Sequence, residues 1–177
     1  MKEIPRHGYG VSDMKKTTIC IDPGITGAIA IIPPEGHARV FDMPTMAKNS
    51  GNGQQVNPYE LSRIIIEVMD SACDVVAYVE RVNAMPGQGV TSMFSFGQAY
   101  GVIHGVLGAL DIPVEFPTPQ QWKKFHGLIG KPKDSARTLA IQKFPYLSKD
   151  LARKKDVGRA DALLIGLYGG RLGDKSF

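Results

Sequence analysis

Three acidic residues lie in apolar surroundings at separate points of the chain. Asp22 follows the β-branched run 17–21 (TTICI), Glu80 closes the apolar run 74–79 (DVVAYV), and Asp161 is enclosed by small and aliphatic residues. A carboxylate in such surroundings loses hydration free energy unless it meets a cation. We therefore treat these three residues as candidate ligands of a metal ion.

Two of these residues also have a purely structural interpretation. Asp22 begins the segment Asp-Pro-Gly, in which an aspartate can start a turn by bonding its own backbone. Asp161 can face solvent from an amphipathic helix. Both alternatives remain open on the sequence alone.

Clustered carboxylates would give the site a definite chemistry. Because their charges repel, they need divalent cations, and ligands that are all oxygen select Mg²⁺ or Mn²⁺. Two such ions about 4 Å apart can bind both the attacking water and the leaving oxygen of a phosphodiester. The only cysteines, Cys20 and Cys73, have no zinc-site spacing. The pattern predicts phosphodiester hydrolysis with two Mg²⁺ ions per site, for which Mn²⁺ substitutes.

The order of predicted elements is strand, strand, strand, helix, strand, helix, strand, followed by helices. The expected strands are 17–21, 27–32, 37–41, 74–79 and 112–116. The expected helices are 58–71, 91–110, a short helix opened by 118–121, 135–143 and 160–169. This order is typical of an α/β, RNase H-like fold, with a mixed five-stranded sheet flanked by helices. The first three strands are expected to be antiparallel.

Length and composition fit one soluble domain. The chain has 177 residues, of which 43% are hydrophobic and 21% charged, and no apolar run approaches the roughly 20 residues that span a bilayer. We expect a flexible, polar tail at 1–16 and one nuclease domain at 17–177. The tail lacks the apolar core of a signal peptide, so we expect a cytoplasmic protein that is neither secreted nor bound to a membrane.

Positive charge is concentrated in one part of the chain. Between Gln120 and Ala160 there are eleven Lys or Arg and three Asp, a net charge of +8 in a chain whose total is +4. Such asymmetry is typical of proteins that bind a polyanion, because phosphate contacts supply most nucleic-acid affinity. The alternative is that these lysines lie on the solvated faces of ordinary helices.

The sequence resembles the RuvC-like Holliday-junction resolvases, on the branch that contains the plant chloroplast resolvase and its phage relatives. The resemblance spans about Thr17 to Gly169. It depends on 19–30 (ICIDPGITGAIA), 79–80 (VE), 154–165 (KKDVGRADALLI), 100–101 (YG), 119–124 (PQQWKK) and 133–135 (KDS). Asp-x-Gly alone also begins the phosphate loops of actin-like ATPases.

The resemblance implies that Asp22, Glu80 and Asp161 are the metal ligands. Bacterial members carry a fourth acid or a histidine three residues before the helix aspartate, a position held here by Gly158, whereas Asp156 lies five residues before. Five helical residues turn through about 140°, so Asp156 can face the same site only if it precedes the regular helix. We expect Asp156 to be a fourth catalytic ligand; a capping residue or a partner of Lys154 are the alternatives.

The resemblance also implies DNA-contacting residues. Lys133 resembles a catalytic lysine of the chloroplast branch, which would stabilise negative charge at the scissile phosphate, although Lys131 is a second candidate and either can simply contact the DNA backbone. The glycine-rich loop 81–90 corresponds to the place where this branch inspects bases. The residues expected to bind DNA are Arg81, Asn83, Gln88, Lys123, Lys124, Lys131, Lys154, Lys155 and Arg159.

Three glycines at intervals of four, Gly97, Gly101 and Gly105, give the predicted helix 91–110 one smooth face. This face can pack tightly on the sheet or form the contact of a homodimer. A two-fold dimer would suit a four-way junction, because the two active sites would be placed for paired nicks.

These inferences predict a homodimeric Holliday-junction resolvase, a Mg²⁺-dependent endonuclease that binds branched DNA. One alternative is an RNase H-like nuclease that acts on RNA–DNA hybrids or on other branched DNA. Another is a non-catalytic protein that binds DNA junctions. An actin-like ATPase is disfavoured, because that architecture needs two such domains.

Overall fold

The computed structural model describes residues 16–49, 51–72, 74–83 and 87–173. The expected tail, apart from Lys16, and Cys73 therefore lie outside the described residues. Across the described ranges, no helix combines the length and the apolar character that a membrane crossing requires.

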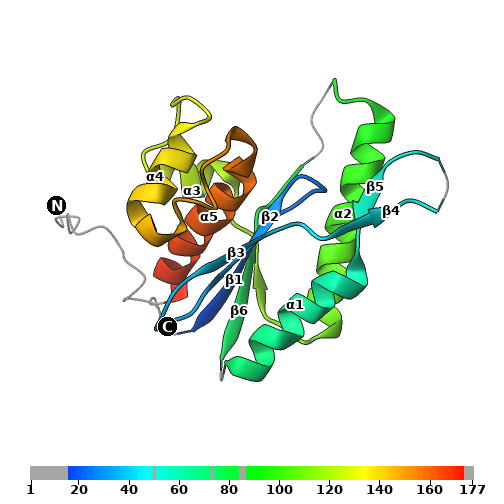
Figure 1. Cartoon of the computed structure of the whole chain (residues 1–177). Helices are drawn as coiled ribbons and strands as arrows, with labels where there is room; N and C mark the ends of the chain where they lie inside the picture. Colours follow the sequence, from blue (N-terminus) through cyan, green and yellow to red (C-terminus); the bar gives the residue numbers. More distant parts are fainter. Residues whose placement is uncertain (1–15, 50, 73, 84–86, 174–177) are drawn as a thin grey trace.

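A mixed sheet forms the centre of the molecule, with the strand order β3-β2-β1-β6-β7 (Figure 1). Its strands are β1 (Thr17–Asp22), β2 (Ala28–Ile32), β3 (Arg39–Asp42), β6 (Val75–Val79) and β7 (Val114–Glu115). β1 pairs antiparallel with β2, and β2 with β3, whereas β6 runs parallel to both β1 and β7. The predicted five-stranded mixed sheet with an antiparallel start is confirmed.

Helices cover both faces of this sheet, which explains why the central strands are almost continuously apolar. One face carries α1 (Pro58–Ser71) and α2 (Val90–Ala109). The other carries α3 (Pro119–Phe125), α4 (Ser135–Lys143) and α5 (Val157–Gly173). Along β1 the side chains alternate between the two cores: Ile19 and Ile21 join the first, and Cys20 joins the second.

The close packing of α5 on the sheet depends on two glycines. Cys20 of β1 and Tyr78 of β6 are direct neighbours in the register. An added Cβ on Gly169 would lie 2.5 Å from the Tyr78 ring, and one on Gly166 would overlap Cys20 Sγ. Without side chains at these positions, α5 lies directly against β1 and β6. That contact determines where the N-terminal part of α5, with Asp161, meets the strand ends.

Capping residues begin two helices where the sequence predicts them. The Asn57 side chain accepts hydrogen bonds from the Tyr59 and Glu60 amides at 3.1 and 3.2 Å, before a proline at the first position of α1. Thr118 and Gln121 form a capping box at the start of α3. Both caps satisfy amide donors that a helix start leaves without partners.

The structure also differs from the expected elements. A hairpin of β4 (Thr45–Ala47) and β5 (Gln54–Val56) was not predicted, because its residues are mostly polar and exposed. β7 is shorter than expected, with prolines close to both ends. α5 begins earlier than expected, directly after a 3-10 turn, η3 (Lys154–Asp156), and a second 3-10 turn, η2 (Pro145–Leu147), follows α4.

Candidate active site

The carboxyl ends of β1 and β6 bring two of the candidate ligands together. The strands run in parallel with Ile21 opposite Val79, so Asp22 and Glu80 leave the sheet side by side. The Glu80 amide donates a hydrogen bond to the Ile21 carbonyl at 3.0 Å. This bond extends the pairing of β1 and β6 up to the two acidic residues. Parallel neighbouring strands therefore account for this pair.

Asp161 completes the group from the first turns of α5. Its charge raises the pKa of Asp22, and the charge of Glu80 raises the pKa of Asp161, so the three carboxylates lie within range of one another. They do not yet converge as a ligand shell: among the described residues, no three His, Cys, Asp or Glu side chains are close enough to hold a metal ion as they stand. The three acids therefore lie near one another at the edge of the sheet without forming a ligand shell.

Burial is the main cause of the raised pKa values of these three carboxyl groups. It raises the pKa of Asp22 well above its ordinary value, and the negative charges of Glu80 and Asp161 add to the effect. Burial likewise raises the pKa of Asp161 to about 7. For Glu80 the rise from burial is opposed by a hydrogen bond from Trp122. Such clustered, perturbed carboxylates are typical of functional sites.

One oxygen of Asp161 lacks the partner that a metal ion could supply. Its Oδ1 atom is buried and has no hydrogen-bond partner within the protein, which costs about 1–3 kcal/mol for a buried polar atom and more for a charged one. A divalent cation would supply the missing partner and offset the repulsion among the acids. Because every donor is a carboxylate oxygen, the residues fit a hard cation such as Mg²⁺ or Mn²⁺.

Glycines allow the backbone to approach Asp22 closely. Gly24 has φ of +115°, and its carbonyl accepts a hydrogen bond from the Gly27 amide at 3.1 Å, which closes the turn after β1. An added Cβ on Gly158 would lie 3.1 Å from Asp22 Oδ2. The position at which bacterial relatives were expected to carry a fourth ligand therefore adjoins the site, but in this chain it contributes no side chain.

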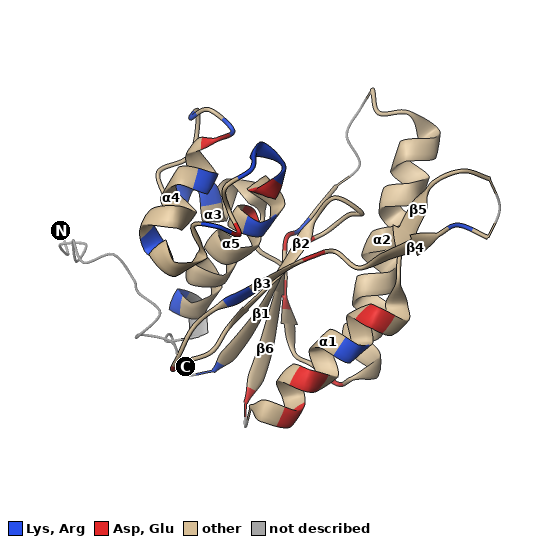
Figure 2. Ribbon diagram, in the orientation of Figure 1, with Lys and Arg blue, Asp and Glu red and all other residues tan. Residues whose placement is uncertain are grey.

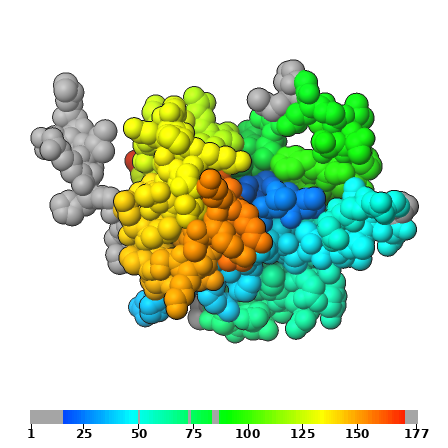
Figure 3. All heavy atoms as spheres, turned by 45° about the horizontal axis from the view of Figure 1, so that its top comes forward, coloured from blue at the N-terminus to red at the C-terminus, as the bar shows by residue number. Residues whose placement is uncertain are grey.

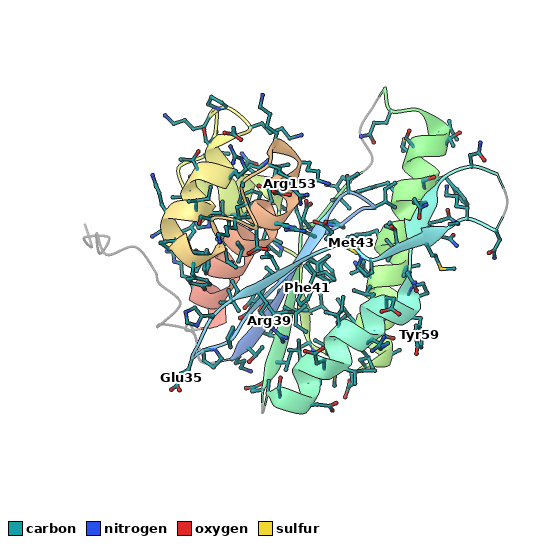
Figure 4. All side chains as sticks on the ribbon, in the orientation of Figure 1. Glu35, Arg39, Phe41, Met43, Tyr59 and Arg153 are labelled. Carbon is teal, nitrogen blue, oxygen red and sulfur yellow. The ribbon has the colours of Figure 1, made fainter. Side chains whose placement is uncertain are left out.

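Asp156 is bonded to the protein instead. It precedes the regular helix, as a fourth ligand would require, but its oxygens accept hydrogen bonds of 2.8 to 3.2 Å from the backbone and side chain of Arg153 (Figure 4). Burial alone would raise the pKa of Asp156, but these bonds outweigh it and lower the pKa. The capping alternative is the one the structure shows, with Arg153 in place of Lys154 as the partner. A metal-ligand role for Asp156 stays a prediction that requires these bonds to break.

Two lysines face the carboxylates. The charge of Lys123 lowers the pKa of Asp22, Glu80 and Asp161, and that of Lys133 lowers the pKa of Asp22 and Asp161. Lys131 is not among the charges that act on these groups. Of the two candidates for an active-site lysine, only Lys133 has a charge that acts on the acids, and Lys123, which the sequence indicated only as a DNA contact, acts on them too. The choice of Lys133 as the active-site lysine stays a prediction.

Basic residues are concentrated in α3, α4 and the loop before α5 (Figure 2). The exposed members of the expected DNA-binding set there are Lys124, Lys131, Lys154 and Lys155, and the predicted catalytic residue Lys133 is exposed in the same region. Figure 3 shows a hollow in this face, with the turn after β1 as its floor, the α4–α5 region on one side and α2 on the other. The carboxylates therefore lie beside a surface with basic residues along one wall.

Arg159, which was expected to contact DNA, is bonded within the protein, and its assignment to DNA stays a prediction. Its guanidinium bonds Asp42 Oδ1 at 2.7 Å and the Asp150 carbonyl at 3.0 Å, and the side chain is only 15% exposed. These bonds tie the start of α5 to β3. Its role in the structure is to hold these segments together.

The loop after Glu80 lies at the same edge of the sheet. Arg81, Asn83 and Gln88 are exposed, so their side chains are accessible to a nucleic acid. Positions 84–86 of this loop lie outside the described residues. The assignment of these three side chains to DNA stays a prediction.

One further residue near the acids was not predicted as functional. Trp122, the only tryptophan, is fully buried, and its indole Nε1 donates to Glu80 Oε1 at 2.8 Å. The sequence indicated only that its segment resembles the chloroplast branch. The available sequence signal was a single tryptophan four residues after the predicted helix cap Thr118. The pattern does not show which acceptor its N–H bonds.

The glycines of α2 do not pack on the sheet. Gly97, Gly101 and Gly105 are exposed, and an added Cβ on any of them would have no neighbour within 4 Å. The tight-packing alternative is therefore wrong. The smooth face is directed away from the core.

Comparisons with known proteins agree with this architecture. The Thermus thermophilus RuvC structure superimposes with a TM-score of 0.54 at 19% identity, over 89% of this chain and 96% of that chain. T. thermophilus RuvC in complex with a Holliday junction substrate gives 0.51 at 17% identity, with the same coverage of both chains. The yeast mitochondrial Holliday junction resolvase Ydc2 gives 0.53 at 14% identity, over 94% of this chain and 80% of that one.

The chain has the RuvC-like fold. The predicted RNase H-like class is thereby confirmed. No family model matches the chain. The sequence resemblance is also confirmed: 92 residues, 51% of this chain, are 38% identical to the chloroplastic Holliday junction resolvase MOC1 of Chlamydomonas reinhardtii. The match spans 10% of that relative's length.

The acidity of Asp161 generates a test on metal-free protein. Because its pKa is raised to about 7, the folded state binds more protons than the unfolded state between about pH 4 and 7, and stability falls as pH rises through this window. Asp161→Asn should therefore raise the free energy of unfolding by about 2–4 kcal/mol at pH 8 and by little at pH 4. Urea denaturation at both pH values measures this.

The matched control is Asp70→Asn on the exposed side of α1, which should change stability by less than about 0.5 kcal/mol at either pH. Equal stability of wild type and Asp161→Asn at pH 8 would contradict the proposed burial of a repelled carboxylate.

Proposed function

We propose that this RuvC-like chain is a metal-dependent endonuclease that cleaves four-way DNA junctions. The observation that carries the proposal is the group of Asp22, Glu80 and Asp161 at the end of two parallel strands, with the buried Asp161 Oδ1 lacking a partner. The resolvases that share the sequence and fold support the choice of substrate.

In this proposal the three carboxylates hold Mg²⁺, two ions per site, with Mn²⁺ as a substitute. Bound there, the metal supplies Lewis-acid activation of water and neutralises charge on the scissile phosphate. The chain's own residues orient these ligands, and Lys133 and Lys123 add positive charge beside them. A preorganised cation stabilises the charge that develops during phosphodiester hydrolysis. Water is the nucleophile, so no covalent intermediate on the protein is required.

The DNA contacts proposed for this chain combine the basic wall with the loop after Glu80. Exposed lysines along α3, α4 and η3 would follow the phosphate backbone and give most of the affinity. Arg81, Asn83 and Gln88 would reach base edges near the cleavage point. Such a division implies strong salt dependence of binding, with a smaller effect of base sequence.

A homodimer through α2 is the proposed assembly. The exposed face of α2 carries three glycines and the apolar side chains of Val90 and Phe94, which are 84% and 68% exposed. Glycines allow the backbones of two helices to approach closely, and a two-fold axis matches the symmetry of a four-way junction. The second subunit would provide the second nick.

Two other functions remain to be tested with the same site. An RNase H-like nuclease would cleave RNA–DNA hybrids or flaps as fast as junctions, and a non-catalytic binder would hold junctions without cutting them in Mg²⁺ or Mn²⁺. Cleavage of a labelled junction, a flap and a hybrid by the same preparation distinguishes the three.

The role of Asp22 gives the primary test. Asp22→Asn keeps the shape of the side chain but removes a negative charge from the ligand group, so junction binding should persist while cleavage falls by at least about a hundredfold. Gel-shift and single-turnover cleavage assays on a synthetic four-way junction in Mg²⁺ measure the two effects. Cleavage by the variant at the wild-type rate would refute the assignment.

The two candidate lysines form a matched pair. Lys133→Ala should lower the single-turnover cleavage rate by about 10- to 1000-fold, because it removes a positive charge beside Asp22 and Asp161. Lys131→Ala should weaken junction binding in a salt-dependent way and leave the rate at saturating protein unchanged. Equal rate losses in both variants would remove Lys133 from the site.

The dimer contact is tested by Gly101→Glu. The added side chain has space within the subunit, but like charges would face each other across the two-fold axis, so association should weaken by more than about tenfold. Sedimentation equilibrium measures the change. Met69→Glu on α1, with a side chain 36% exposed, is the control that should associate as the wild type does. An unchanged dimer in Gly101→Glu would exclude this face.

A further inference from the structure

Trp122 is fully buried, yet its one polar atom is directed at a candidate metal ligand. The indole Nε1 donates to Glu80 Oε1 at 2.8 Å, across 42 positions of sequence. An indole N–H is a donor with no acceptor function. A tryptophan that only filled the core could meet any carbonyl, but this one bonds an acid of the active-site group.

The contacts around Trp122 leave it little freedom to move. α3 is held at its start by the Thr118–Gln121 capping box, in which the Thr118 amide donates to Gln121 Oε1 at 2.8 Å. The segment just before α3 is joined to the end of β6, because the Arg81 amide donates to the Pro117 carbonyl at 2.8 Å. The end of β6 at Glu80 and the helix α3 with Trp122 are therefore joined by two hydrogen bonds, Arg81 to Pro117 and Trp122 to Glu80.

The packing of the indole fixes its direction as well. Trp122 is 0% exposed within the core formed by α3, α4, α5 and one face of the sheet. The Lys123 ammonium lies 5.1 Å from the centre of the Trp122 ring. Rotation of the indole away from Glu80 would require this core to open. The hydrogen-bond donor is thus preorganised.

We propose that Trp122 is a positioning residue for Glu80: its buried N–H holds Oε1 and leaves Oε2 available to a divalent cation. The inference rests on the proposed function, since it assumes that Glu80 binds metal. Loss of a side chain that orients a metal ligand by a hydrogen bond typically weakens metal affinity about 10- to 100-fold. Glu80 has three rotatable side-chain bonds, and this hydrogen bond restricts them before metal arrives.

The test replaces the donor and keeps the ring. Trp122 is exchanged for β-(3-benzothienyl)alanine, in which sulfur replaces the N–H of the indole, and separately for phenylalanine. Mg²⁺ and Mn²⁺ affinities of the full chain are measured by calorimetry, together with the Mg²⁺ concentration that gives half-maximal junction cleavage. Both variants should bind metal about 10- to 100-fold more weakly than the wild type. 5-Fluorotryptophan, which keeps the N–H, should restore the wild-type affinity.

Phe144→Leu provides the control for a loosened core. Phe144 is fully buried in the same cluster as Trp122, so its truncation should lower stability while metal affinity remains that of the wild type. Unchanged metal affinity in the benzothienyl protein would overturn the inference, and so would an equal loss of affinity in Phe144→Leu. If the wild type itself neither binds metal nor cleaves junctions, the proposed function fails together with this inference. If the wild type binds metal and cleaves junctions, and the benzothienyl protein has the same metal affinity, only the role of Trp122 is refuted.

Discussion

The mutual repulsion of three buried carboxylates is the constraint on which the other features of this molecule depend. Asp22, Glu80 and Asp161 raise the free energy of the folded chain, since burial opposes the ionisation of all three and like charge adds to the effect at Asp22 and Asp161. Proteins keep such an arrangement where it has a use, because apolar residues of similar size would stabilise the fold more. In the proposed function, a bound divalent cation would attract all three carboxylates and offset this cost.

Several parts of the fold serve to hold these acids against their repulsion. Parallel pairing of β1 and β6 places the first two side by side, and the glycines of α5 at Gly166 and Gly169 let the helix approach closely enough to add the third. Trp122 bonds Glu80 from the core side. The charges of Lys123 and Lys133 oppose the repulsion at Asp22. Holding the ligands and charges in place at this site thus lowers the stability of the folded chain.

Much of this arrangement was predictable from local patterns. Apolar runs that end in an acid placed Asp22 and Glu80 at strand ends, and the cap at Asn57 set the start of α1. What the sequence could not show was which charged side chains bond to each other. Asp156 and Arg159 carry charges suited to metal and DNA, but each is bonded to a nearby opposite charge. The direction of the α2 glycines and the acceptor of the Trp122 N–H likewise depend on tertiary packing. The segments that form β4 and β5 lack the alternation of apolar and polar residues that would have predicted strands.

The central claim, that one metal centre joins Asp22, Glu80 and Asp161, can be tested most directly with Fe²⁺ in place of Mg²⁺. Ascorbate and peroxide would generate hydroxyl radicals at the bound iron, and mass spectrometry would locate the resulting cuts in the polypeptide. We predict cuts clustered around residues 22, 80 and 161 together, which excess Mg²⁺ suppresses. Cuts confined to one of these segments, or spread along the chain and insensitive to Mg²⁺, would contradict a shared metal centre.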